Sequence, residues 1–337
     1  MTYYLGIDGG GTKTYALLSD EYGNVLGTGR SGNGNHQTGG AEAAHSIQEA
    51  TFEALAEAGL QLEDIQHAYL GLAGADREAD YNILHPMIRK IGFTQYTINC
   101  DTIIGLRAGT NRSYGIALIC GTGTNAAGRN PQGQHYQCGG FDYMYGDFGG
   151  GGSLNIEVFR SVIRAWDGRE QPTLLTGLLL KLLGYTRVDV LFNDFLDHGK
   201  QVPVDAARLL FEAAAEGDAV ALEILQRQGV ELSKSATAVI HKLGMEKEIF
   251  DVVLAGSLLT RGDRGWIRPL IEQAVLAAAP QATVVTLTTE PVVGAVWSAM
   301  EYGGISISEE VYEKMRVYQD FAAIKPMIKT GVIDLDN

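Results

Sequence analysis

The stretch YYLGIDGGGTKTYALLS, which begins at Tyr3 and ends at Ser19, contains two apolar runs separated by a glycine turn. Tyr3–Asp8 and Tyr15–Ser19 have the length and apolar character of strands, and three consecutive glycines follow the first of them. A second turn at residues 22–24 and a third strand at Val25–Gly29 come next. This stretch therefore predicts an antiparallel three-stranded meander whose first turn is rich in glycine.

The same layout returns about 113 residues later, counted from Gly9 to Thr122 (122 minus 9). Gly115–Cys120 is an apolar strand, GTGT at residues 121–124 is a glycine turn, and strands at 125–128 and 134–138 flank a turn at 130–133. The repeat predicts two similar α/β domains that face each other across a central cleft.

Hydrophobic periodicity and capping residues predict the remaining elements. Helices are expected at 41–58, 80–91, 152–166, 173–183, 204–216, 218–243, 265–278 and 291–302, and strands at 67–72, 96–99, 250–255 and 283–287. We place the N-terminal domain at residues 1–113 and the C-terminal domain, with helical additions, at 114–302. The charged, amphipathic tail at 303–337 has two interpretations: it packs back onto the first domain, or it is a solvated end.

Composition excludes several classes of protein. The net charge of −14 argues against a nucleic-acid-binding surface, which needs clustered Lys and Arg. Three cysteines without a CxxC pair favour a reducing compartment over a zinc site or a disulfide framework. The N-terminus lacks the basic start of a signal peptide, and Lys181 interrupts the longest apolar run, Leu174–Leu183. We therefore expect a cytoplasmic protein that does not bind membranes.

The two glycine turns predict a pair of phosphate-binding loops. Glycine lets backbone N–H groups converge on an anion without interference from a Cβ atom. Asp8 ends the strand before the first turn, where its carboxylate could hold a water bound to Mg²⁺. The residues expected to contact nucleotide phosphates are Gly10, Gly11, Thr12, Lys13 and Thr14 in the first loop and Gly121, Thr122, Gly123 and Thr124 in the second.

Other phosphate motifs fit poorly. Thr12 stands where the Walker A motif requires lysine, and the GxGxxA pattern at 121–126 is followed by a turn instead of a helix. The remaining alternative is that the glycines serve only tight hairpins.

These residues resemble the first phosphate motif of the actin, heat-shock ATPase and sugar kinase superfamily. Within it, nearly the whole chain resembles the BadF/BadG/BcrA/BcrD ATPase family, and its N-acetylglucosamine kinases most of all. The motifs that carry the resemblance occur in order: Asn35-His36, Gly74-Ala75-Asp76, Asp101, Gly121–Asn125, Cys138-Gly139-Gly140, Gly146-Asp147 and Gly256-Ser257. The resemblance implies two actin-like (ribonuclease H-like) domains around a nucleotide and sugar cleft, with ATP and Mg²⁺ as cofactors.

The resemblance also implies roles for individual residues. Asp101 matches the general base that accepts the proton of a sugar hydroxyl, although a helix cap is the alternative. Residues matching substrate-binding positions are Asn35, His36, Asp76, Asp101, Gly139, Gly140 and Asp147, and those matching the adenosine motif are Gly256 and Ser257. From local sequence, loop roles for Asn35 and His36 are as good. Phe141, Asp142 and Phe148 depart from the pattern of the eukaryotic kinases beside the sugar.

Two enzyme functions follow as expectations. The first is an ATP-dependent kinase that phosphorylates the 6-hydroxyl of an amino sugar: N-acetylglucosamine, glucosamine or N-acetylmuramic acid. The second is an ATPase that activates a CoA-ester dehydratase or reductase, although the GTGT loop and the cysteines lack the context of those proteins. A sugar-sensing role without catalysis is a third alternative, and homodimers are common in the family.

Overall fold

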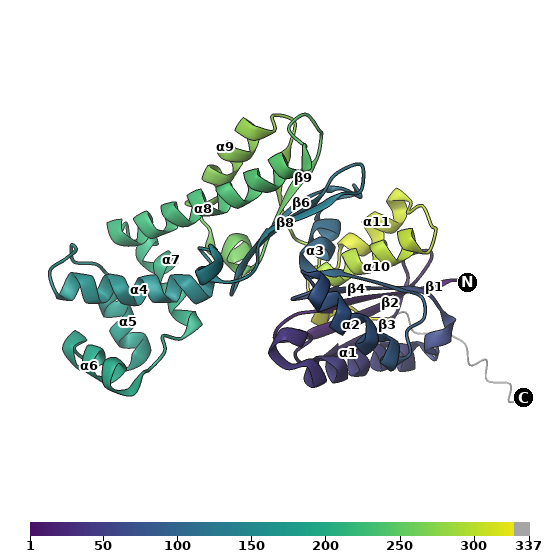
Figure 1. The fold of residues 1–337 in the computed structure, drawn as a ribbon, viewed down its shortest axis with the longest axis horizontal. Helices are drawn as coiled ribbons and strands as arrows, with labels where there is room; N and C mark the ends of the chain where they lie inside the picture. The colour runs from purple at the N-terminus through teal and green to yellow at the C-terminus, as the bar shows by residue number, and fades with distance from the viewer. Residues whose placement is uncertain (327–337) are drawn as a thin grey trace, which may run out of the picture. The chain divides into compact units, whose positions relative to one another are not determined.

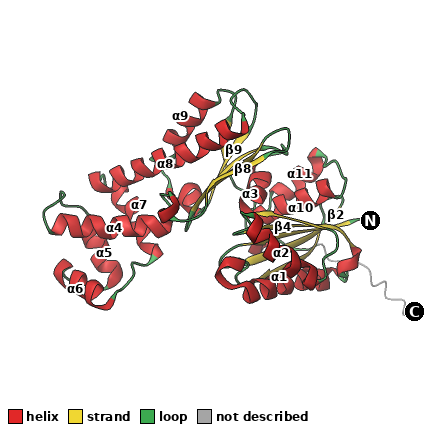
Figure 2. Ribbon diagram, viewed as in Figure 1, coloured by secondary structure: helices red, strands yellow, loops and turns green. Residues whose placement is uncertain are grey.

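The computed structural model describes residues 1–326 and divides into two α/β units (Figure 1). The first unit contains Met1–Ser113 and the described residues from Leu287 onward, and the second contains Tyr114–Thr286. Each unit is built on one five-stranded sheet (Figure 2). The prediction of an α/β fold with two sheets is confirmed, whereas the predicted cleft stays a prediction.

The first sheet has the strand order β3-β2-β1-β4-β5. Its strands are β1 (Tyr3–Gly9), β2 (Thr14–Asp20), β3 (Val25–Ser31), β4 (Ile65–Leu72) and β5 (Tyr96–Cys100). β1, β2 and β3 pair antiparallel as the meander predicts, and β4 and β5 add parallel strands beside β1. The carboxyl ends of β1, β4 and β5 therefore meet at one edge of the sheet.

Helices cover both faces of this sheet. α1 (His36–Ala58) and α2 (Glu78–Ile91) bury Ile47, Leu55 and Leu84 against one face. α3 (Asp101–Gly109), α10 (Pro291–Tyr302) and α11 (Glu309–Arg316) pack on the other face around Trp297. In Figure 1 these two groups of helices lie on opposite sides of β1–β4.

Glycine allows the helices to approach the sheet backbone closely. A Cβ atom at Gly29 of β3 would lie 1.8 Å from the carbonyl oxygen of Ala50 in α1. One at Gly6 of β1 would lie 2.5 Å from the backbone nitrogen of Val296 in α10. No side chain fits at either position, so packing alone accounts for part of the high glycine content.

The second sheet has the order β10-β9-β6-β7-β8, which is the same arrangement as the first sheet. Its strands are β6 (Gly115–Cys120), β7 (Thr124–Arg129), β8 (His135–Gly139), β9 (Asp251–Ala255) and β10 (Thr283–Thr286). β6, β7 and β8 pair antiparallel, and β9 and β10 extend the sheet in parallel. The internal repeat predicted from the sequence is confirmed by this shared strand order.

The helices of the second unit form one core with its sheet. They are α4 (Gly151–Trp166), α5 (Leu175–Leu183), α6 (Val188–His198), α7 (Arg208–Ala215), α8 (Ala219–Leu243) and α9 (Arg268–Ala278). Asp218 caps α8 by accepting a hydrogen bond from the backbone nitrogen of Ala221, as its position predicts. α6 is absent from the sequence prediction.

The second unit ends at Thr286, earlier than the predicted domain end at residue 302. Residues 287–302, placed in the second domain by sequence, belong to the first unit. The reason is close packing of α10 against α3, where a Cβ at Gly294 would lie 2.2 Å from the carbonyl oxygen of Ile104. α11 also packs in the first unit through Val311 and Met315, and the part of the predicted tail at 327–337 lies outside the described residues.

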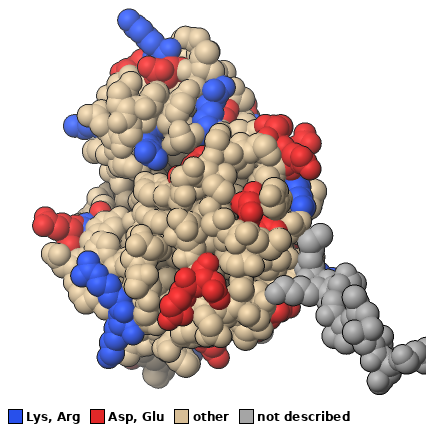
Figure 3. Space-filling view, turned by 90° about the vertical axis from the view of Figure 1, so that its right-hand side faces the viewer, with Lys and Arg blue, Asp and Glu red and all other residues tan. Residues whose placement is uncertain are grey.

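Within residues 1–326, every helix is too short or too polar to cross a lipid bilayer. On the face shown in Figure 3, Lys and Arg side chains lie apart from one another among Asp and Glu side chains. Absence of nucleic-acid binding stays a prediction.

We predict that Gly29→Ala lowers the free energy of unfolding by about 2 kcal/mol or more, because its Cβ would overlap the α1 backbone. Urea denaturation measures the change. Gly177→Ala is the matched control, since Gly177 lies exposed in α5 with open space around its Cβ position. The free energy of unfolding of this control should rise by about 0.5–1 kcal/mol, because alanine favours the helix more than glycine does. Equal stability of the two variants would contradict the packing argument.

Candidate functional site

The first glycine turn is held to the sheet by its carbonyl groups. Ala73 donates its backbone N–H to the Gly9 carbonyl at 2.8 Å, and Gly34 donates to the Gly10 carbonyl at 2.8 Å. A Cβ at Gly11 would have no described atom within 4 Å, so neither packing nor a positive φ requires glycine there. The space left beside Gly11 fits a phosphate cradle.

Lys13 is positioned by an aromatic pair. Its Nζ atom donates to the Tyr15 hydroxyl at 3.1 Å and lies 4.4 Å from the centre of the Tyr15 ring. Tyr15 in turn stacks on Phe321 of the C-terminal segment, with ring centres 3.9 Å apart. Thr12 and Lys13 are exposed at the turn, where they can reach a ligand.

Thr14 has a different environment from the one predicted. Its side chain is fully buried, and its hydroxyl donates to the Gly32 carbonyl at 2.9 Å. Thr14 therefore fastens the loop after β3, instead of presenting a hydroxyl to phosphate as the sequence suggested.

Two carboxylates lie at the carboxyl edge of the first sheet, and the charge of Asp101 makes the ionisation of Asp8 less favourable. Asp8 is the second-last residue of β1, and burial together with the charge of Asp101 raises the pKa of Asp8 to about 7, against the opposing effect of Lys13. Burial also raises the pKa of Asp101, and Asp76 adds to the increase. Because a nearby cation would relieve this repulsion, the donor set fits a hydrated Mg²⁺ ion bound with ATP.

Asp101 is the first residue of α3. The N-cap position is Cys100, so Asp101 lies one residue inside the helix instead of at the cap position. Asp101 accepts from the Cys100 thiol at 3.2 Å and from the Thr102 hydroxyl at 3.4 Å. The carboxylate is half-buried, in a position open to a ligand.

The second glycine turn, between β6 and β7, is held by the start of α4. Gly151 and Gly152 donate their backbone N–H groups to the carbonyls of Gly121 and Thr122, both at 2.8 Å. Cβ atoms at Gly121 and Gly123 would have no described neighbour within 4 Å. As in the first turn, these glycines border open space and fit a phosphate-binding role.

Gly256 follows β9 at a position where only glycine fits. Its φ is +87°, and a Cβ would lie 2.3 Å from the carbonyl oxygen of Cys120. Ser257 is exposed beside it and precedes a single π-helical turn, η4 (Leu258–Gly262). These two residues therefore lie against the end of β6, immediately before the second glycine turn.

Asp147 anchors the loop that follows β8. Its Oδ2 atom accepts from the backbone nitrogens of Gly140, Phe141 and Asp142, at 3.0, 2.7 and 2.8 Å. This use of Oδ2 leaves Oδ1, which faces Gly139, as the oxygen available to a ligand hydroxyl.

The departures from the eukaryotic pattern have distinct environments. Phe141 is 40% exposed, whereas Phe148 is buried beneath the guanidinium of Arg227, 4.2 Å from its ring centre. Asp142 has a φ of +97°, and among residues 1–326 no other non-glycine residue has a positive φ. A residue held in this strained region is typical of ligand-binding loops.

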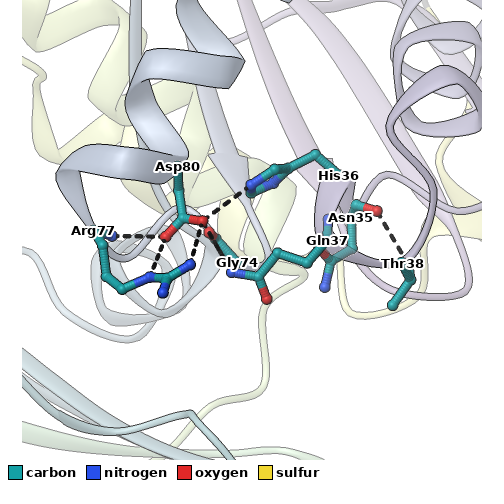
Figure 4. Close-up of polar contacts among 7 residues, drawn as sticks. All are labelled: Asn35, His36, Gln37, Thr38, Gly74, Arg77 and Asp80. Atoms are coloured by element: carbon teal, nitrogen blue, oxygen red, sulfur yellow. Dashed lines mark hydrogen bonds and ion pairs between the residues drawn. The ribbon is translucent and has the colours of Figure 1, made fainter.

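Asn35 and His36 start α1, and the turn after β4 lies against them (Figure 4). Asn35 caps the helix by accepting from the Gln37 backbone nitrogen at 2.9 Å, which leaves its Nδ2 group as a donor. His36 is buried, with Nε2 3.2 Å from the Oδ1 atom of Asp80. The structure thus gives His36 a buried polar contact with Asp80 instead of the solvated loop position considered from sequence.

Several residues of the site escaped the sequence prediction. Asp80, Gln37 and Arg77 connect the two loops that carry Asn35 and Asp76. The signal for Asp80 is its place three residues after the helix cap Arg77, where it completes a capping box. For the start of α4, the signal is the glycine run at 149–152.

We predict that Asp8→Asn stabilises the protein at alkaline pH. Because the folded-state pKa of Asp8 is raised to about 7, the wild type loses stability as pH rises from about 4 to about 7, and the variant does not. The difference in free energy of unfolding between the variant and the wild type should grow by about 2 kcal/mol or more from pH 5 to pH 8, because each unit of pKa shift corresponds to about 1.4 kcal/mol. Urea denaturation without Mg²⁺ measures it. Asp197→Asn, at an exposed position in α6, is the control; the same pH trend in both variants would contradict the prediction.

The chain is similar to amino-sugar kinases. The N-acetylmuramic acid/N-acetylglucosamine kinase of Clostridium acetobutylicum is 31% identical over 263 residues, 77% of this chain and 86% of that protein. The N-acetyl-D-glucosamine kinase of Dictyostelium discoideum is 30% identical over 312 residues, 88% of this chain and 97% of that protein.

A solved structure shares the fold. A candidate N-acetylglucosamine kinase from Chromobacterium violaceum aligns with a TM-score of 0.69 at 24% identity, over 88% of this chain and 98% of that chain. Residues 5–299 also match the BadF/BadG/BcrA/BcrD ATPase family. The resemblance seen in the sequence motifs is therefore confirmed, and the chain belongs to the BadF/BadG/BcrA/BcrD ATPase family.

Proposed function

We propose that this protein is an ATP-dependent kinase that phosphorylates the 6-hydroxyl of an amino sugar. The observation that carries the proposal is Asp101, a half-buried carboxylate with a raised pKa beside Asp8 at the carboxyl edge of the first sheet. The similarity to N-acetylglucosamine and N-acetylmuramic acid kinases supports the amino sugar as the substrate class. N-acetylglucosamine is the first candidate, followed by glucosamine and N-acetylmuramic acid.

In the proposed mechanism Asp101 acts as the general base. A carboxylate within about 3 Å of the sugar hydroxyl accepts its proton as the oxygen attacks phosphorus. When bound, ATP supplies the phosphoryl group and Mg²⁺ neutralises its charge. Asp8 would hold the hydrated cation, and positive charge near Asp8 and Asp101 would lower the raised pKa of both carboxylates.

The two glycine turns bind the phosphates in this proposal. Gly10, Gly11 and the exposed Thr12 and Lys13 form the first cradle, and Lys13 supplies a cation held in place by Tyr15. The second cradle consists of Gly121, Thr122, Gly123 and Thr124, and Gly256 and Ser257 contact the adenosine. Thr14 contributes by fixing the loop after β3.

The sugar is held by groups from loops of both sheets. In the first unit these are Asn35, through its Nδ2 donor, and Asp76. His36 helps to position their loops through its contact with Asp80. In the second unit the proposed sugar contacts are Gly139, Gly140 and the Oδ1 atom of Asp147. Fixed hydroxyl partners of this kind orient the 6-hydroxyl toward Asp101.

The alternative function, activation of a CoA-ester dehydratase or reductase, has less support. The two relatives described above, each at least 30% identical over 77% or more of this chain, are sugar kinases. Cys120 is fully buried, so it does not lie on a surface where two copies of the chain could share a cluster. Cys138 is the least buried of the three cysteines.

We further propose that the protein acts in the cytoplasm as a homodimer. Three free cysteines suit a reducing compartment, and dimers are common in the family.

We predict that Asp101→Asn abolishes sugar phosphorylation, with a loss of at least about 100-fold in kcat, and leaves nucleotide binding nearly intact. A coupled assay of ADP release and a nucleotide titration measure the two properties. Because the pKa of Asp101 is raised, the acid limb of the wild-type kcat profile should lie above the pH expected for an ordinary aspartate. Turnover like that of the wild type would reject Asp101 as the base.

We predict a clear preference for amino sugars in kcat/KM. The panel contains N-acetylglucosamine, glucosamine, N-acetylmuramic acid and glucose, each with saturating ATP. A buried or fixed polar group that pairs with the 2-substituent discriminates against a sugar lacking it. Higher kcat/KM for glucose than for all three amino sugars would contradict the assignment.

A further inference from the structure

Asp80 lies at the centre of a buried polar cluster in the first unit (Figure 4). Its carboxylate is 2% exposed and accepts five hydrogen bonds from three residues. His36 and Gln37 donate to Oδ1 at 3.2 Å each. Arg77 donates its Nη2 group to Oδ1 at 2.9 Å, and its backbone nitrogen and Nε to Oδ2 at 3.0 and 2.9 Å.

This cluster connects two separate loops. His36 and Gln37 belong to the start of α1 after β3, whereas Arg77 and Asp80 belong to the start of α2 after β4. Gln37 also donates to the Gly74 carbonyl at 3.1 Å. Gly74 has a φ of +79°, and a Cβ there would lie 2.8 Å from the Oδ1 atom of Asn35. The two loops are therefore fitted together immediately beside Asn35 and Asp76.

The chemistry of the cluster requires an ionised carboxylate. The Arg77 guanidinium holds the pKa of Asp80 well below its usual range. All the groups that face Asp80 here are donors: the Arg77 fork, the Gln37 amide and His36, whose Nε2 must carry a proton because an ionised carboxylate only accepts. A neutral amide at this position would keep one acceptor and turn a donor toward the same groups.

The first glycine turn is fastened without Asp80. Its links to the loops after β3 and β4 are backbone hydrogen bonds from Gly34 and Ala73. A change that loosens side-chain contacts around Asp80 leaves those backbone bonds in place. Asn35 and Asp76, in contrast, depend on how the two loops fit together.

We propose that Asp80 is a positioning residue for the sugar: its carboxylate holds the loop of Asn35 against the loop of Asp76 and so sets the substrate face of the first unit. This inference rests on the proposed kinase function. It assigns to Asp80 an effect on sugar binding that is separate from any effect on ATP.

The test is steady-state kinetics of Asp80→Asn with N-acetylglucosamine and ATP varied separately. We expect KM for the sugar to rise about tenfold or more, because losing a hydrogen bond to a charged group typically weakens the structure that it holds by enough to change a binding constant tenfold. KM for ATP should stay within about twofold of the wild type. Glu78→Gln, on the exposed first turn of the same helix, is the matched control and should leave both constants unchanged.

A second variant covers the case in which Asp80→Asn folds poorly. Gln37 is exposed, so Gln37→Ala should keep the wild-type Tm and still raise KM for the sugar about threefold, because it removes one donor of the cluster. An unchanged sugar KM in these variants, or equal rises for sugar and ATP, would overturn the role of Asp80. A wild type without sugar-dependent ADP release would instead overturn the kinase assignment itself.

Discussion

The position of Asp101 depends on how closely α3 approaches the first sheet. Gly71 of β4 lies opposite Asp8 in the register, and a Cβ there would lie 2.4 Å from the Ile104 side chain of α3. On its other side α3 contacts α10, where a Cβ at Gly294 would lie 2.2 Å from the Ile104 carbonyl oxygen. Because these two positions lack side chains, the short helix α3 fits between the sheet and α10. Its first residue, Asp101, directly follows β5 and so lies at the carboxyl edge of the sheet.

This packing makes the ionisation of Asp8 less favourable. Asp8 and Asp101 share a poorly hydrated edge, and the charge of Asp101 adds to the burial that raises the pKa of Asp8 to about 7. Near neutral pH the folded state therefore contains a carboxylate that is not fully ionised until positive charge approaches. Binding of a cation and loss of this proton are linked, so the site is least strained when it is occupied.

Apolar runs, turn residues and helical periodicity predicted those elements that pack against elements adjacent in the sequence. β1, β2 and β3 follow from alternating apolar runs and turns, and α10 was predicted with the bounds that it has in the structure. The unit to which α10 belongs was mistaken, because that depends on contact with residues almost 200 positions away in the sequence. The buried bonds of Thr14 and of His36 escaped for the same reason: residue type suggests a ligand, and only the fold shows the partner.

The two glycine turns occupy equivalent places in their sheets but are fastened in different ways. The second is held by Gly151 and Gly152 of α4, within a segment whose Gly149 carbonyl accepts from Gln228 of α8 at 2.6 Å. The first is held by Gly34, the residue directly before Asn35. One peptide therefore separates the group that holds the proposed phosphate turn from the group proposed to bind the sugar. The bond from Gly34 to the Gly10 carbonyl is made by backbone groups alone, so the phosphate turn stays fastened when the side-chain contacts around Asn35 change.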